Sequence, residues 1–188
     1  MKLKTRDMIL VALFAALTAI GAFIRIPIPY VPFTLQYFFC AFSGILLGSR
    51  LGALSQALYV AIGLSGIPVF THGGGLSYIF QPTFGYLIGF IACAYVIGKL
   101  TEKMKSISFI KNYLAILSGM FFLYLFGLIH LYLIFNFYLL KPKSISWVFF
   151  YGCLTVIGSD FVLSAFIAML SSKILPILRR SSLTPSRS

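Results

Sequence analysis

The sequence predicts an all-α integral membrane protein with six transmembrane helices, and three observations support this fold class. Hydrophobic residues make up 60% of the 188-residue chain, and the mean hydropathy is +1.01. Charged residues make up only 10%, against about 25% in soluble domains. Several apolar runs reach the roughly 20 residues that a spanning helix needs. We therefore expect a single membrane domain over residues 1–178, followed by a basic, disordered tail over residues 179–188.

Basic residues lie mostly at the ends of alternate apolar runs. Of the 15 Lys and Arg residues, only Arg25, Lys141 and Lys143 fall at ends predicted to face outward. This asymmetry follows the positive-inside rule, so the N and C termini are expected in the cytoplasm and the number of spans is expected to be even. The net charge of +12 suits the anionic lipid of an inner leaflet and needs no nucleic acid as partner.

The first predicted span follows the basic N-terminal residues and continues to Ile26. It carries alanines in two pairs at spacing i, i+4, which predict one small-residue face: Ala12 with Ala16, and Ala15 with Ala19. Small residues at this spacing let a second helix approach closely in a membrane. The sequence leaves open whether that helix belongs to the same chain or to a partner.

Three prolines within residues 27–32 end this span, and residues 26–34 are expected to cross the outer surface as an extended loop. Two short apolar segments follow, at residues 33–47 and 51–64, joined by a tight inner turn over residues 48–52. Short, glycine-interrupted segments mark places where a helix stops part-way through the membrane, although tilting or bilayer thinning is the ordinary explanation.

Residues 65–86 form the most irregular stretch of the chain. Glycines, two prolines, His72, Gln81 and hydroxyl-bearing residues gather here between long apolar runs. Irregular backbone at membrane depth is tolerated only where protein, water or a ligand satisfies its N–H and C=O groups. This loop is therefore the first place to expect a small-molecule site.

Three more apolar runs complete the six expected spans. The fourth covers residues 84–100, and a basic inner loop follows over residues 101–111. The fifth, residues 113–140, amounts to about 28 residues or ~42 Å of helix, more than a ~30 Å hydrocarbon core requires. The last covers residues 146–172 and is interrupted by Gly-Ser-Asp at residues 158–160.

Asp160 is the only acidic residue inside a predicted span, since Asp7 and Glu102 lie at cytoplasmic ends. A carboxylate at membrane depth costs ~2.5 to 3.5 kcal/mol on insertion scales, so it is expected to face protein, a partner or a cavity. Its possible roles are accepting hydrogen bonds from a solute, relaying protons, binding a cation, pairing with a lysine or capping a broken helix. Cation sites gather several carboxylates, and proton paths several titratable groups. A single Asp therefore favours solute binding.

Polar residues and glycines from distant segments share the same outer level in this topology. Converging polar groups with aromatic walls are typical of small-molecule pockets. The candidate binding residues are Asp160, Lys143, Gln36, Thr34, Gly73, Gly74, Tyr78, Gln81 and Tyr86. Lys143, with Arg25 as the alternative, is the expected partner for a solute carboxylate. The roles of His72 and His130 stay open.

Motifs for catalysis and metal binding are absent from the sequence. There is no Walker A pattern, no Gly-x-Ser-x-Gly, no His-Glu-x-x-His and no carboxylate pair. Cys40, Cys93 and Cys153 lie in apolar runs without Cys-x-x-Cys spacing. We therefore expect neither an enzyme nor a metal site. Because the chain cannot hydrolyse a nucleotide by itself, active transport would need an energising partner.

Five motifs follow one another over most of residues 1–165. They are PIPYVPFTLQ at 27–36, GILLGSRLG at 44–52, GIPVF followed by GGG within 66–75, PTFGYLIGF at 82–90, and GSD at 158–160. Each motif is weak alone, but the series is specific. In this order and spacing they resemble the BioY family, the biotin-specific substrate-binding S components of energy-coupling-factor (ECF) vitamin transporters.

The resemblance implies the six-helix S-component fold, with an outward-facing biotin pocket covered by the loops after the first and third helices. It implies a bacterial cytoplasmic membrane protein that takes up biotin with an ECF transmembrane T component and two ABC-type ATPases, and that uses no cofactor. In such systems the first helix meets the T component through an Ala-xxx-Ala face, and the candidate partner contacts are Ala12, Ala15, Ala16 and Ala19. Asp160 matches the carboxylate of the sixth helix that holds the ureido N–H groups.

The chain departs from the family pattern at three places. Leu163 stands where members commonly have a lysine, His72 accompanies the glycines where some members carry an asparagine, and Leu87 stands where some have an arginine. These departures leave open which residue meets the biotin carboxylate. Two alternatives to biotin uptake also stay open: an S component for another small vitamin, and a membrane-embedded enzyme using Asp160 and His130.

Overall fold

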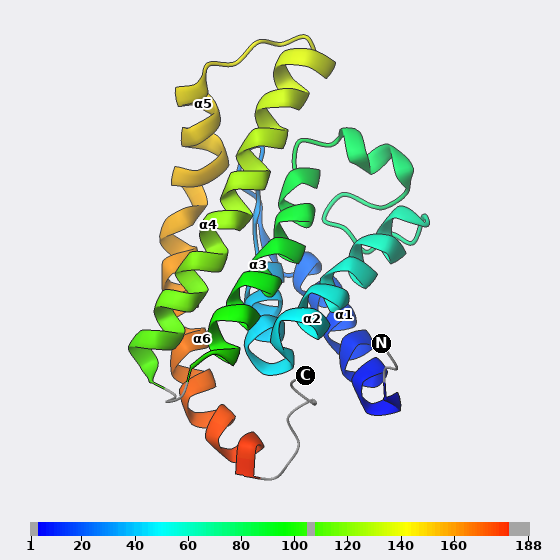
Figure 1. Cartoon of the computed structure of the whole chain (residues 1–188). Coiled ribbons are helices and arrows are strands. Elements are labelled where there is room, and N and C mark those ends of the chain that lie inside the picture. Colours follow the sequence, from blue (N-terminus) through cyan, green and yellow to red (C-terminus); the bar gives the residue numbers. More distant parts are fainter. Residues whose placement is uncertain (1–3, 105–107, 181–188) are drawn as a thin grey trace.

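The computed structural model describes residues 4–104 and 108–180 and is helical apart from one short hairpin (Figure 1). Its elements are α1 (Thr5–Phe23), β1 (Arg25–Ile26), β2 (Phe33–Thr34), α2 (Gln36–Leu64), η1 (Leu76–Phe80), α3 (Phe84–Glu102), α4 (Phe109–Leu133), η2 (Ile134–Tyr138), α5 (Ile145–Phe149), η3 (Phe150–Leu154) and α6 (Thr155–Arg180). Within the described residues, five helical segments are long and apolar enough to cross a membrane. The predicted all-α class is confirmed.

α2 is a folded helical hairpin, because the chain reverses at Gly48. Gly48 has φ 84° and ψ −179°, a conformation that strains residues other than glycine. A Cβ added to Gly52 would lie 2.9 Å from the Cα of Gly44, whereas a straight helix separates residues eight apart by about 12 Å. The two short segments predicted at residues 33–47 and 51–64 are the halves of α2. The turn predicted between them exists, but it is confined to Gly48 rather than spread over residues 48–52, because helix continues on both sides of Gly48.

Glu102, the last residue of α3, holds this turn in place. The backbone N–H of Ser49 donates to Glu102 Oε1 at 2.7 Å, and the Ser49 hydroxyl lies 3.0 Å from both carboxylate oxygens. α3 comes close here without an intervening side chain, since a Cβ on Gly98 would lie 2.2 Å from the Ser49 nitrogen. The close packing of α2 on α3 provides the framework for the outer loops.

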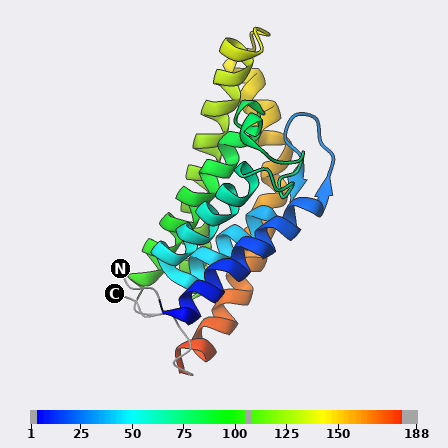
Figure 2. The same ribbon diagram turned by 90° about the vertical axis from the view of Figure 1, so that its right-hand side faces the viewer.

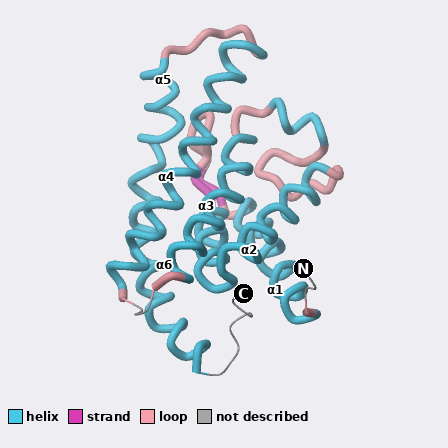
Figure 3. The backbone as a smooth tube through the Cα atoms, in the orientation of Figure 1, coloured by secondary structure: helices cyan, strands magenta, loops and turns pink. Residues whose placement is uncertain are grey.

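One end of the bundle carries the irregular segments, and we call it the outer end. The β1–β2 hairpin, in which Arg25 pairs with Thr34, lies there beside the loop over residues 65–83 (Figures 2 and 3). α1 begins and α6 ends at the opposite end. The loop predicted over residues 26–34 thus exists, and it closes a short antiparallel hairpin.

α4 and the segment from α5 to α6 form a long hairpin that reaches furthest at the outer end (Figure 1). Asn136 joins its arms, because its side-chain amide bonds both the N–H and the carbonyl of Lys143. The helix interruption predicted at residues 158–160 is wrong: α6 runs unbroken through them, and the helix instead widens into a π-turn at η3. α6 also continues through Pro176 to Arg180. The rest of the predicted tail, residues 181–188, lies outside the described residues.

The four candidate alanines of α1 lie within about 100° of one another around the helix. Ala15 is buried, and Ala19 packs against the core. Ala12 and Ala16 are exposed. This small-residue face therefore lies at the border of the packed side of α1: one pair contacts the core of the chain, and the other pair remains accessible to a partner.

Candidate functional site

A cavity, which we call the inner cavity, lies among α2, α3, α4 and α6 and is bordered by the β1–β2 hairpin and the loop over residues 65–83. It contains about 570 Å³ of space not filled by atoms, solvent at its mouth included. Its apolar walls include Phe33, Leu87, Phe90, Leu123 and Val156. Five candidate residues from the sequence meet here: Asp160, Gln36, Thr34, Tyr78 and Tyr86.

Asp160 is the only carboxylate among the described residues that line the inner cavity. Its side chain is 7% exposed, and the Tyr124 hydroxyl donates to its Oδ2 at 2.6 Å. A carboxylate offers about four lone-pair sites, so this hydrogen bond leaves acceptor capacity for a ligand. Ser164, one turn further along α6, donates to the Asp160 carbonyl at 2.7 Å and lies 2.7 Å from the Tyr37 hydroxyl. These contacts fix the position of Asp160 against α2 and α4.

Tyr86 links α3 to the widened segment before α6. A π-turn shifts the backbone hydrogen-bond register, and the carbonyl of Gly152, inside η3, accepts from the Tyr86 hydroxyl at 2.6 Å. The Tyr86 ring meets the Tyr124 ring edge-to-face at 6.2 Å. The π-turn therefore helps to orient the aromatic side of the cavity that contains Asp160.

Gln36 ties the outer loop to α2. Its Nε2 donates to the Tyr59 hydroxyl at 2.7 Å, and that hydroxyl donates to the Val69 carbonyl at 3.0 Å. Its Oε1 accepts from the hydroxyls of Thr34 and Thr71 at 3.1 and 3.2 Å. The Gln36 amide thus clamps β2 and the loop beside the inner cavity, a role that sequence reasoning did not assign to it.

A second and more polar cavity, which we call the outer cavity, adjoins the inner one at Pro32 and Thr83, which line both. It contains about 970 Å³ of space not filled by atoms, open solvent included. Arg25, His72 and Gln81 also line it. The candidate residue Gln81 and the alternative carboxylate partner Arg25 therefore lie in the outer cavity.

Lys143 and the two candidate glycines line neither cavity. Lys143 Nζ lies 4.8 Å from the centroid of the Trp147 ring, a cation–π contact. Gly73 has φ +110°, and a Cβ on Gly74 would lie 2.3 Å from the Ile67 carbonyl oxygen. Both glycines shape the loop through backbone conformation and close approach. The ligand contacts predicted for these three residues stay predictions.

His130 packs against the outer loop. Its Nε2 lies 3.2 Å from the Gln81 carbonyl oxygen, and its ring meets Phe84 edge-to-face at 5.7 Å. No histidine is among the described residues that line the inner cavity with Asp160. The arrangement therefore does not assemble an Asp–His pair for catalysis.

Sequence reasoning missed four polar residues that line the inner cavity: Tyr37, Thr71, Thr83 and Tyr124. Thr71 and Thr83 belong to the loop that its hydroxyl-bearing residues already distinguish, so a signal for them existed. Tyr124 lies 36 residues before Asp160 within a continuous apolar run. In the sequence, a tyrosine within such a run cannot be distinguished from a residue that only packs. Only the folded chain brings it to the carboxylate.

Residues 1–180 match the sequence model of the BioY family. This chain belongs to the BioY family. It is 44% identical over 176 residues to the probable biotin transporter BioY of Lysinibacillus sphaericus, covering 94% of this chain and 90% of that protein. It is 42% identical over 148 residues to the biotin transporter BioY of Thermotoga maritima, covering 76% of this chain and 83% of that protein. The resemblance carried by the five motifs is confirmed.

The fold of this BioY-family chain also matches a solved structure. The crystal structure of the S-component for biotin from an ECF-type ABC transporter has a TM-score of 0.80 to it, covering 93% of this chain and 95% of that chain at 24% identity. At this identity the similarity shows the fold alone. The S-component fold predicted from the sequence is confirmed.

Proposed function

We propose that this chain binds biotin and acts as the substrate-specific subunit of an ECF-type uptake system in a bacterial cytoplasmic membrane. The inner cavity carries the proposal, because it combines one buried carboxylate, Asp160, with aromatic, aliphatic and hydroxyl-bearing walls. Membership of the BioY family and the biotin transporters among the relatives support it.

The chemistry of biotin matches these walls. Its cyclic urea presents two N–H donors, and hydrogen bonds to an ionised carboxylate are about twice as strong as neutral ones. Asp160 accepts from this urea, while Tyr124 holds the other side of the carboxylate. The sulfur ring and the aliphatic chain of biotin pack on Phe33, Leu87 and Phe90. Burial of this apolar surface adds about 25 cal/mol per Å² removed from water.

The reversal at Gly48 supports a count of six spans. Each half of α2 then crosses part of the membrane, and the other four helical segments cross it once each. An even number of crossings places the start of α1 and the end of α6 on the same side. Arg50, beside the turn, and Lys99, near the end of α3, belong to that side, which the positive-inside rule assigns to the cytoplasm.

Partner subunits supply the energy in this proposal. The exposed pair Ala12 and Ala16 on α1 offers a close-approach surface to a helix of the T component. Two ATP-binding-cassette ATPases then drive uptake, since the chain itself has no Walker A motif. Biotin and membrane lipid are the other partners that the proposal requires.

Equilibrium dialysis of radiolabelled biotin against the purified protein tests the proposal. We expect saturable binding of one biotin per chain, displaced by unlabelled biotin and unaffected by excess riboflavin or thiamin. The bound label should be recovered as unchanged biotin, because no Asp–His pair is assembled in the inner cavity. Displacement by riboflavin or thiamin, or a chemically altered product, would reject the assignment.

A further inference from the structure

Two side chains capable of positive charge line the outer cavity. Arg25 comes from β1 and His72 from the loop over residues 65–83, and both are exposed to solvent. One N–H of the Arg25 guanidinium donates to the Thr71 carbonyl at 2.5 Å. A guanidinium has five N–H donors, so this hydrogen bond orients Arg25 and leaves donors for another acceptor.

No acidic side chain is among the described residues that line this cavity. The chain has three acidic residues. Asp7 is in the first turn of α1, 16 residues or about 24 Å of helix before its outer end. Glu102 bonds Ser49 at the turn of α2, and Asp160 bonds Tyr124 in the inner cavity. Arg25 therefore lies in a region of uncompensated positive charge that attracts anions.

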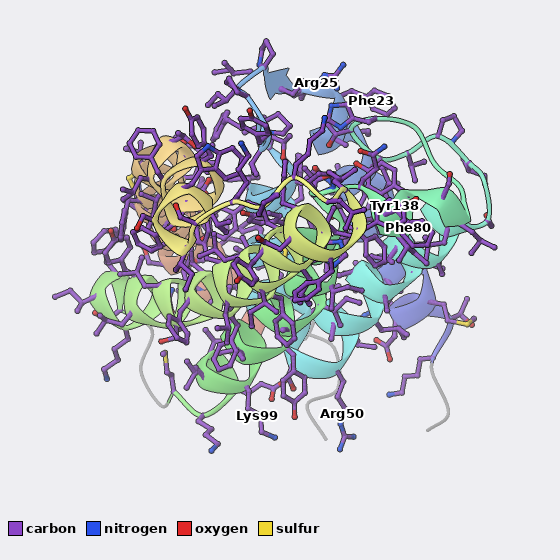
Figure 4. The ribbon with its side chains drawn as sticks, turned by 90° about the horizontal axis from the view of Figure 1, so that it is seen from above. Phe23, Arg25, Arg50, Phe80, Lys99 and Tyr138 are labelled. Carbon is purple, nitrogen blue, oxygen red and sulfur yellow. The ribbon has the colours of Figure 1, made fainter. Side chains whose placement is uncertain are left out.

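The view from above shows Arg25 apart from two other basic side chains, Arg50 and Lys99. Arg25 lies beside Phe23 on one side of the bundle, and Arg50 and Lys99 lie on the other side (Figure 4). The inner and outer cavities adjoin at Thr83. A ligand with hydrogen-bond donors at one end and an anion at the other can therefore span the two cavities in a single orientation.

We propose that Arg25 and His72 form the subsite that binds the carboxylate of the ligand in the outer cavity. This rests on the proposed function, because it assumes that the urea of biotin lies against Asp160 in the inner cavity. Arg25 provides a permanent charge with a fork of N–H donors that matches a carboxylate. His72 provides a second donor that depends on pH.

The rival cation, Lys143, is less suited to this role. It lines neither cavity and lies over the Trp147 ring, and the Asn136 amide bonds its backbone on both sides. Trp147 in turn packs at 4.7 Å on Tyr30, a residue of the outer-cavity lining. Lys143 thus packs beside the outer cavity through Trp147 and Tyr30, whereas Arg25 lines the cavity itself.

His72 gives the subsite a predicted pH dependence. Partial burial and, secondarily, the nearby Arg25 guanidinium lower the pKa of His72 below its usual value of about 6.5. The other titratable groups around it are Arg25 from β1, Tyr30 from the hairpin loop and Tyr78 from η1, and burial raises the pKa of Tyr78. A bound carboxylate favours protonated His72 and so raises its pKa. Binding then takes up a proton, and affinity increases as pH falls through the pKa of the complex, by at most about tenfold per pH unit.

The test compares biotin with biotinamide, its uncharged analogue, on four forms of the full chain: wild type, Arg25→Met, Lys143→Met and Lys141→Met. Lys141 is exposed and lines neither cavity, so its variant controls for the loss of one outer charge. We expect Arg25→Met to raise the dissociation constant for biotin about 10- to 100-fold and to leave biotinamide within about threefold. Neither lysine variant should distinguish the two ligands.

The outcomes separate this subsite from the wider proposal. If Arg25→Met weakens the binding of biotin and biotinamide equally, Arg25 only positions the loop through Thr71. If Lys143→Met weakens biotin binding alone, the carboxylate binds Lys143 instead. Either result overturns the inference. Failure of wild type to bind both ligands would instead reject biotin binding itself.

The pH arm uses His72→Gln. Between pH 8 and 5.5 an aliphatic carboxylate, with a pKa of about 4.3 as in Glu, stays ionised. Wild type should bind biotin more tightly at the lower pH, with no such change for biotinamide or in His72→Gln. The same pH profile for both ligands, or for wild type and variant, would remove His72 from the subsite.

Discussion

Asp160→Asn is expected to raise the dissociation constant for biotin by about 100-fold or more. Two hydrogen bonds from the urea to a charged acceptor are worth about 1.5 to 3 kcal/mol each. Asparagine keeps one acceptor oxygen but presents an NH2 group where the carboxylate accepted. Because the substitution removes a buried charge at constant shape, the variant should fold, and its thermal unfolding midpoint should be at least that of wild type. Equilibrium dialysis and a melting curve on the same preparation measure both effects.

Tyr124→Phe is the matched control for this change. It removes the hydroxyl that donates to Asp160 at 2.6 Å but leaves the carboxylate and the ring in place. We expect it to weaken biotin binding less than Asp160→Asn, by about tenfold at most, which corresponds to one hydrogen bond. Asp160→Asn with wild-type affinity would show that the urea binds elsewhere.

Ala16→Trp is expected to abolish co-purification with the T component while leaving biotin affinity unchanged. Ala16 is exposed on α1, whereas Ala15 on the neighbouring face is buried at 2% exposure. An indole at a small-residue contact separates two helices that otherwise touch backbone to backbone. Affinity purification of the tagged variant, expressed together with the T component and both ATPases, measures the association.

Leu13→Trp controls for adding an indole to α1. Leu13 is 49% exposed and lies about 100° around the helix from Ala12 and about 60° from Ala16. Its side chain is therefore expected to face lipid beside the proposed interface. This variant should keep the complex. Loss of biotin binding together with the complex in Ala16→Trp would point to a disturbed fold, and retention of the complex would remove Ala16 from the interface.

Much of the fold was predictable because hydropathy and the positions of prolines are local signals. The apolar runs correspond to helices, and the prolines at residues 27–32 correspond to the hairpin between α1 and α2. The predicted break at residues 158–160 failed because a single glycine does not by itself end a helix: α6 continues through Gly158, where an added Cβ would meet nothing within 4 Å. The π-turn at η3 has no such composition signal. The division of the α1 alanines depends on how the helix is rotated against α2, which its own residues do not specify.

The site was predictable where chemistry alone makes a residue conspicuous. Asp160 is costly at membrane depth unless it has partners, and it lies in the inner cavity. Gly73 and Gly74 were expected beside the ligand, but the same backbone freedom serves the loop itself. Tyr124 was missed because a tyrosine in an apolar run resembles any packing residue. Contacts between distant segments decide these cases, and one sequence does not encode them locally.

A structure of the protein with biotin bound would show directly whether Asp160 accepts from the urea. We predict biotin in the inner cavity, with its urea nitrogens about 2.7 to 2.9 Å from the carboxylate oxygens of Asp160, the spacing of charge-assisted hydrogen bonds. Biotin bound outside this cavity, or inside it with the urea turned away from Asp160, would rule out this role of Asp160.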